Sequence, residues 1–149
     1  MSDDDAATPV LHHLGPGDLP MLLAVAPGLF DHPIDPDQAR AFLESPLNRL
    51  VIATLGGQAV AFASATVLLH PDKPPALFVN ELGTREPYQR RGLGRAVLMA
   101  LIERARTEGC KGIWLGTEMD NAPARALYLS AGGQETVFAG YEWDGAFDD

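Results

Sequence analysis

Residues 86–97, EPYQRRGLGRAV, combine the residue types that suit an anion-binding loop. Three arginines stand around Gly92 and Gly94: Arg90, Arg91 and Arg95. A glycine lets the backbone approach a phosphate closely because it has no Cβ, and a helix N-terminus adds unpaired N–H groups and positive potential. The stretch lacks the GxxxxGK of a Walker loop and the third small residue of a dinucleotide fingerprint. The stretch therefore predicts a phosphate-binding loop of another kind. The alternative interpretation is that the arginines only solvate the start of a surface helix.

The bulk composition narrows the class of protein. The chain has 149 residues, 46% of them hydrophobic, which fits one globular domain with its own core. The net charge of −9 argues against a nucleic-acid partner, which would need a basic face, and suits a cationic one. Cys110 is the single cysteine, and no run reaches the roughly 20 apolar residues of a membrane span. We therefore expect a cytoplasmic protein without a membrane partner.

The elements that must position the loop follow from apolar periodicity and from turn residues. We expect strands at 8–14, 49–55, 58–69, 76–84, 111–117 and 134–143. We expect helices at 19–30 with a break at Pro27 and Gly28, at 35–45, at 93–108 and within 120–133. Gly56 and Gly57 join the second and third strands in an antiparallel hairpin. The sequence predicts a single α/β domain over 8–143, between a disordered acidic tail at 1–7 and a flexible acidic tail at 144–149.

Two motifs on consecutive predicted helices resemble those of a known family. QRRGLGRAVL is similar to the pyrophosphate-binding motif of the GNAT superfamily of N-acetyltransferases, Q/R-x-x-G-x-G/A. NAPARALYLSAGG, on the next helix, resembles the companion motif N-x-x-A-x-x-L-Y-x-x-x-G. The likeness extends from Thr8 to Trp143 and departs at Gly133, where the family often has an aromatic residue. It implies a GNAT-like fold, a mixed and mostly antiparallel central sheet flanked by about four helices.

The resemblance implies acetyl-coenzyme A (acetyl-CoA) as the cosubstrate. Its pyrophosphate would lie against Gln89, Arg90, Arg91, Gly92, Leu93, Gly94 and Arg95. Its pantetheine arm would pair with Leu82, Gly83 and Thr84, where two parallel strands splay apart, and would contact Asn121 and Ala124. The match also implies that Tyr128 protonates the leaving thiolate; without the motif, a core aromatic is the simpler interpretation. No metal is expected, because the four histidines show no ligand spacing.

Glu81 is the candidate general base for an amine substrate. In LFVNELG, strict alternation puts Leu77, Val79 and Glu81 on one face of the strand, where the pattern expects a third apolar residue. An amine arrives mostly protonated and must lose a proton before it attacks a thioester. A partly buried carboxylate beside the cofactor loop suits that task, directly or through water. The alternative is an ion pair near the strand end, with Arg85 as the partner.

Within the superfamily, the chain most resembles the small aminoglycoside 3-N-acetyltransferases, on the stretches ELGTREPYQRRGLGRAVL and GTEMDNAPARALYLSAGG. This likeness implies an aminoglycoside acceptor acetylated at the 3-amine. A polycationic sugar would suit an acceptor side with the acids Glu118, Asp120 and Glu142, and the first two are also the reserve candidates for the base. Acetylation of a protein N-terminus, a lysine or a polyamine is the alternative within the class. A non-catalytic acetyl-CoA sensor is the alternative from another class. A homodimer is a further expectation, because family members often dimerise.

Overall fold

The computed structural model describes residues 8–145, so the tail expected at 1–7 and most of the one at 144–149 lie outside the described residues. One sheet has the strand order β1-β2-β3-β4-β5. The strands are β1 (Val10–Leu14), β2 (Asn48–Leu55), β3 (Gln58–Leu68), β4 (Ala76–Thr84) and β5 (Gly112–Trp114). The α-helices are α2 (Leu19–Leu23), α3 (Pro36–Glu44), α4 (Leu93–Thr107) and α5 (Ala122–Ser130), with 3-10 turns η1 (Pro16–Asp18) and η2 (Glu86–Tyr88). All neighbouring strands are antiparallel except β4 and β5, which confirms the predicted mixed sheet.

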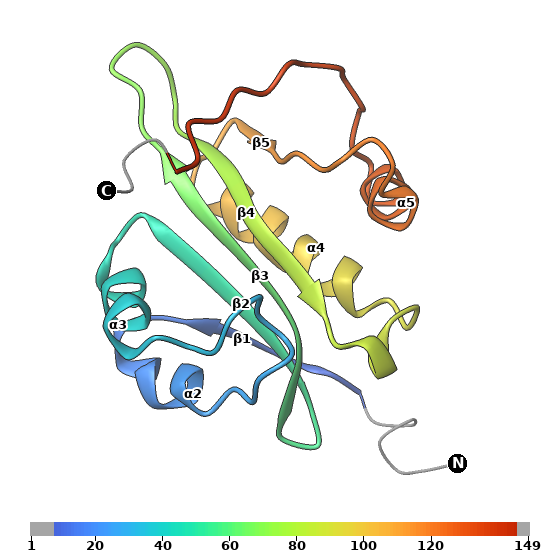
Figure 1. The fold of residues 1–149 in the computed structure, drawn as a ribbon. Coiled ribbons are helices and arrows are strands. Elements are labelled where there is room, and N and C mark those ends of the chain that lie inside the picture. The colour runs from blue at the N-terminus through green and yellow to red at the C-terminus, as the bar shows by residue number, and fades with distance from the viewer. Residues whose placement is uncertain (1–7, 146–149) are drawn as a thin grey trace.

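Helices cover both faces of the sheet (Figure 1). On one face, α4 packs on alternate residues of the central strands through a buried stripe that includes Val97 and Leu101. On the other face, α2 and α3 cover a second cluster around Ile52 and Phe62. Strand residues alternate between the two clusters, as expected of a sheet that is buried on both sides. α5 lies on the side of β4 that faces away from β3, and it contacts α4.

Short-range signals set most element boundaries as predicted. Gly56 and Gly57 both have positive φ, +55° and +80°, and make the tight turn between β2 and β3. The Asp35 carboxylate caps α3 by accepting from the N–H groups of Asp37 and Gln38. α4 ends just before Gly109, whose φ of +89° provides the left-handed residue that commonly follows a helix.

A bulge in β4 overturns the predicted facing of Glu81. Val79 pairs with Ala65 of β3, but the next β3 residue, Ser64, pairs with Glu81, so β4 has one extra residue at Asn80. Val79 stays on the α4 face, whereas Asn80 and Glu81 both line the face covered by α2 and α3. An inserted residue shifts all later side chains to the opposite face because the side-chain period is two. The carboxylate therefore does not replace an apolar residue in the α4 core.

β4 pairs with β5 only over its first three residues. Their last pair is Phe78 with Trp114, whose rings lie 4.3 Å apart between centroids. Beyond it, β4 continues to Thr84, while the chain after Trp114 leaves the sheet toward α5 (Figure 1). The strand predicted at 111–117 is accordingly only three residues long. The separation exposes one backbone edge of β4 over Leu82–Thr84.

The strand predicted at 134–143 is not present. This segment is irregular and forms no backbone hydrogen bond to another part of residues 8–145. The side chains of Val137, Tyr141 and Trp143 are 86%, 80% and 72% exposed, and the Phe138 ring lies against Gly116. The alternation of apolar residues suggested a strand, but a strand also needs a partner edge. The short β5 offers too few residues for a ladder.

The helix predicted at 19–30 is also shorter than expected. α2 ends at Leu23, and residues 24–35 have no helix or strand. The residue before a proline is pushed away from the helical region, and Gly28 has a φ of +103°. These local constraints end the helix before Pro27 and leave a long irregular segment between α2 and α3.

Candidate active site

A pocket of about 430 Å³ opens on the sheet face that carries α2 and α3. Its floor is Leu50 and Ser64 of the sheet, and Asn80 and Glu81 of the bulge stand at its side. The segment between α2 and α3, together with α3 itself, supplies the opposite wall. Apolar lining comes from Leu22, Phe30, Pro33, Ile34, Ala39 and Phe42. Charged or polar lining comes from Asp31, His32, Asp35 and Gln38.

The pocket raises the pKa of the Glu81 carboxyl group. Partial burial is the main cause because it removes water from the charged form, and the negative charge of Asp31 adds to it. His32 acts in the opposite direction. A carboxylate with a raised pKa holds a proton more readily than an ordinary one. It is therefore better matched to accepting a proton from an ammonium ion.

Glu81 has no ion pair with Arg85, which was the alternative interpretation of this acid. The Arg85 guanidinium donates three hydrogen bonds to backbone carbonyl oxygens, those of Ala59, Pro27 and Ala26. No other cation lies within ion-pair distance of Glu81 in residues 8–145. The carboxylate stays open to the pocket.

The arginine-rich loop follows the C-terminal end of β4, shortly after Glu81. Gln89 donates from its side-chain amide to the carbonyl oxygen of Thr84 and so braces the loop against β4. Arg91 lies over the Tyr88 ring, 5.2 Å from its centroid, and Arg95 reaches the carbonyl oxygen of Ser130 on α5. Arg90 is exposed, with a φ of +65°. The three arginines therefore have different surroundings and do not form one cluster.

The backbone of this loop fits an anion. Gly92 caps α4 in the left-handed conformation, with φ of +79° and no side-chain cap. The N–H groups of Leu93, Gly94 and Arg95 form the first turn of α4, and none donates to a backbone or side-chain acceptor in the described part of the chain. Unpaired donors at a helix N-terminus suit a pyrophosphate. The residues thus fit the phosphate end of acetyl-CoA.

Gly94 marks the junction of the loop, β4 and α5. A Cβ atom there would lie 3.4 Å from Leu127 and 3.5 Å from both Leu82 and Thr84. The first turn of α4 is therefore close to the unpaired edge of β4 at Leu82–Thr84. Backbone groups at that edge could pair with an extended amide-containing chain in the way that a further strand would.

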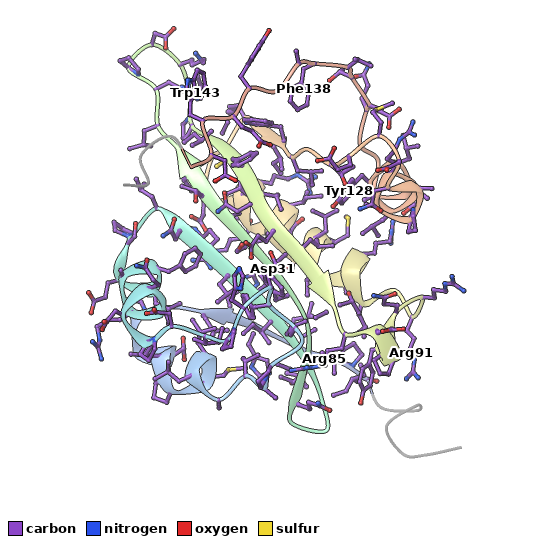
Figure 2. All side chains as sticks on the ribbon, in the orientation of Figure 1. Asp31, Arg85, Arg91, Tyr128, Phe138 and Trp143 are labelled. Atoms are coloured by element: carbon purple, nitrogen blue, oxygen red, sulfur yellow. The ribbon has the colours of Figure 1, made fainter. Side chains whose placement is uncertain are left out.

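The residues expected on α5 fall at its N-terminus and in its middle. The side-chain oxygen of Asn121 caps the helix by accepting from the N–H of Ala124, which leaves the Asn121 amide donors for another partner. Tyr128 is half-buried against the α4 core cluster, and burial raises the pKa of its hydroxyl. Within residues 8–145 this hydroxyl makes no hydrogen bond, and the side chain projects from α5 toward the sheet (Figure 2). It is protonated at neutral pH and can donate a proton.

The acids expected to bind substrate lie elsewhere. Glu118 and Asp120 are exposed in the turn between β5 and α5, and Glu142 is exposed in the irregular C-terminal segment. None of them lines the pocket beside Glu81. The acids that do line it, Asp31 and Asp35, were not identified from the sequence. A signal for them was present, since Asp31 and His32 follow a Pro-Gly break and loops commonly carry binding residues.

No group of three or more His, Cys, Asp and Glu side chains in residues 8–145 is arranged to hold a metal ion. Among the helices that the structure describes, none is long and apolar enough to cross a membrane.

Comparison with known proteins identifies the family. Residues 20–132 match the family described as Acetyltransferase (GNAT), and the chain belongs to this family. The match includes the pocket, the loop and α5, which are the parts described above. The family uses acetyl-CoA, in agreement with the cosubstrate that the motifs implied.

Two curated relatives are N-acetyltransferases. The chain is 39% identical over 84 residues to a ribosomal protein bS18 alanine N-acetyltransferase of Escherichia coli, which covers 56% of this chain and 53% of that protein. It is also 36% identical to an N-alpha-acetyltransferase of Mycobacterium tuberculosis over 105 residues. This alignment covers 70% of the present chain and 63% of that relative. The chain thus spans between about half and two thirds of the length of these relatives.

Solved structures share the fold at low sequence identity. An aminoglycoside acetyltransferase from an uncultured soil metagenomic sample, in complex with sisomicin, superimposes with a TM-score of 0.79 at 17% identity, covering 90% of this chain and 95% of that one. An aminoglycoside N-acetyltransferase in complex with CoA gives a TM-score of 0.74 at 18% identity, covering 91% and 94%. At these identities the likeness concerns the fold, and the acceptor must be inferred from the pocket.

Proposed function

We propose that this protein transfers an acetyl group from acetyl-CoA to a primary amine bound in the pocket beside Glu81. The observation that carries the proposal is the position of β4. The bulge of this strand places Glu81 in the pocket, and the residues that follow directly, Leu82–Thr84, end the strand beside the unpaired N–H groups of α4. A cosubstrate with its phosphates at α4 and its pantetheine arm along Leu82–Thr84 would run toward Glu81. Amine and thioester would then meet at the bulge.

The transfer needs two proton movements, and the chain offers a group for each. Glu81 takes a proton from the ammonium group, directly or through water, so that the amine lone pair attacks the thioester carbonyl carbon. The new C–N bond forms, the C–S bond breaks, and the thiolate of coenzyme A leaves. Tyr128 gives its hydroxyl proton to that thiolate. Burial raises the pKa of both groups, which makes the Glu81 carboxylate a stronger base and keeps the Tyr128 hydroxyl protonated at neutral pH.

The pocket favours an acceptor with one ammonium group next to an apolar group. Asp31 and Glu81 are its open carboxylates, because Asp35 already accepts two backbone hydrogen bonds as the cap of α3. The facing wall is largely apolar, with Phe30 stacked on Phe62 at 3.9 Å between centroids. The N-terminus of a peptide with a small or apolar first residue has this combination. The relative named as a ribosomal protein bS18 alanine N-acetyltransferase supports the same choice.

An aminoglycoside acetylated at its 3-amine is the second candidate acceptor. Asp31, Asp35 and Glu81 give the pocket an acidic character that suits a polycation. Such a sugar carries several ammonium groups and would also need acids outside the pocket. Glu118, Asp120 and Glu142 are exposed and would have to serve in that role.

A thiol-release assay with acetyl-CoA tests both acceptors. The panel contains a peptide with N-terminal alanine, the same peptide with a blocked N-terminus and an internal lysine, spermidine and a kanamycin-like sugar. We expect transfer to the free N-terminus and none to the blocked peptide. NMR or mass spectrometry of the product locates the acetyl group.

The outcomes separate the levels of the proposal. Efficient transfer to the sugar, with both peptides inert, would replace the peptide acceptor by the aminoglycoside. No transfer to any amine, despite a thermal shift with acetyl-CoA, would support a sensor and overturn the catalytic proposal.

A further inference from the structure

Arg85 links three separate parts of the backbone at the end of β4. Its Nε donates to the carbonyl oxygen of Ala59 in β3 at 2.7 Å. Its Nη1 and Nη2 donate to the carbonyl oxygens of Pro27 and Ala26 at 2.9 and 2.7 Å. The last two belong to the irregular segment between α2 and α3. No carboxylate forms an ion pair with Arg85 within residues 8–145, so its charge interacts with carbonyl dipoles.

Apart from these hydrogen bonds, apolar packing and not secondary structure holds this segment. Residues 26–35 contain no helix or strand, and Gly28 adopts a φ of +103° with its Cα beside the Arg85 guanidinium. A second contact lies at Gly83, where a Cβ would be 2.8 Å from the Phe62 ring and 3.3 Å from the Leu29 carbonyl oxygen. Leu29 and Phe30 then pack on the sheet. The segment thus lies against β4 at Gly83 and is hydrogen-bonded to Arg85 at the end of that strand.

The fixed segment leads directly into the pocket wall. Phe30, Asp31, His32, Pro33 and Ile34 follow the two carbonyls that Arg85 holds, and all five line the pocket. Figure 2 shows Arg85 near the end of β4 and Asp31 further along the sheet face. A shift of the segment at Pro27 would therefore move Asp31 relative to Glu81.

We infer that Arg85 is a positioning residue for the acceptor site. It sets the place of Asp31 and of the apolar wall relative to Glu81, while the same strand presents Leu82–Thr84 to acetyl-CoA. A planar guanidinium presents donors from three nitrogens in fixed directions to the three carbonyls, whereas a lysine ammonium presents its three donors from one nitrogen on a flexible stem. This inference rests on the proposed function, because it takes the pocket as the amine site.

The test compares Arg85→Met and Arg85→Lys with a matched control, Arg49→Met. Arg49 also donates to two backbone carbonyl oxygens and to a carboxylate, but it lies on the α4 side of the sheet with Glu108. Loss of a hydrogen bond from a charged group costs about 1.5–3 kcal/mol, or at least about tenfold in an equilibrium. We expect the KM of the amine to rise about tenfold or more in Arg85→Met, with a smaller rise in Arg85→Lys. The Kd of acetyl-CoA and the kinetics of Arg49→Met should remain within about twofold of wild type.

NMR relaxation of the full chain gives a readout that does not depend on catalysis. Backbone order parameters at Gly28–Asp31 should fall from about 0.85 toward 0.6 in Arg85→Met and stay unchanged in Arg49→Met. Unchanged order with an unchanged amine KM would overturn the inference, as would an equal rise of the amine KM in Arg49→Met. If Arg85→Met does not fold, Arg85→Lys decides by the same two measurements. Failure of wild type to acetylate any amine would instead count against the proposed function.

Discussion

The two glycines of the arginine-rich loop should respond in opposite ways to substitution by alanine. Gly92 has a φ of +79°, and a Cβ there would meet nothing within 4 Å. Its substitution is disfavoured by backbone conformation alone. Gly94 lies in the first turn of α4, and its Cβ would make ordinary contacts at 3.4–3.5 Å with Leu127, Leu82 and Thr84.

The magnitudes follow from these two environments. A left-handed conformation costs a residue with a Cβ about 1–2 kcal/mol, so Gly92→Ala should lower the free energy of unfolding by about that amount. For a domain of this size, each kcal/mol is worth about 2–4 °C in Tm. Alanine is favoured over glycine within a helix by about 1 kcal/mol, so Gly94→Ala should be neutral or slightly stabilising.

Acetyl-CoA provides the functional half of this experiment. At 100 times its Kd, a ligand adds about 2.7 kcal/mol to stability, which is a rise of about 5–11 °C here. Gly92→Ala should reduce this rise because it reorients the N–H groups of the loop, and Gly94→Glu should abolish it by filling the junction with β4 and α5. Thermal unfolding with and without acetyl-CoA measures both effects. Equal stability of Gly92→Ala and wild type, or no shift of wild type at millimolar acetyl-CoA, would refute the reasoning.

Three further substitutions test the site. Glu81→Gln should depress turnover mainly at low pH, where unprotonated amine is scarcest. The same substitution should raise the free energy of unfolding at neutral pH, because the raised pKa of Glu81 means that folding disfavours the charged carboxylate. This gain should vanish as the pH falls below the usual carboxyl range, where the carboxyl group is protonated in both states. A loss of stability at neutral pH would contradict the prediction. Tyr128→Phe should lower kcat by about 10²- to 10⁴-fold with acetyl-CoA binding retained, and unchanged kcat would return Tyr128 to a packing role. Asp31→Asn should raise the KM of the amine by up to about fivefold and weaken the dependence of this KM on salt concentration. If the KM of the variant and that of wild type depend equally on salt, Asp31 forms no ion pair with the substrate.

Interactions between residues close together in the sequence determine several local structures of this protein. The loop at 89–95, the hairpin at Gly56 and Gly57, the cap at Asp35 and the stripe of α4 depend on residues close together in the chain. Each rests on a backbone conformation or a helical period that neighbouring residues specify. The two motifs that indicated the family are of this kind as well.

Contacts between distant residues decided what the sequence left open. Alternation could not reveal the extra residue at Asn80, because a bulge is defined by the pairing of β4 with β3. Likewise, the apolar pattern at 134–143 could not show whether an edge would be available for a strand. Asp31 lines the pocket in a segment that is hydrogen-bonded to Arg85 and lies close to Gly83, both more than fifty residues later in the chain. Pairing register and long-range hydrogen bonds to carbonyl groups are properties of the folded chain. The side of the sheet that Glu81 faces and the lining of the pocket beside it could therefore be known only from the tertiary structure.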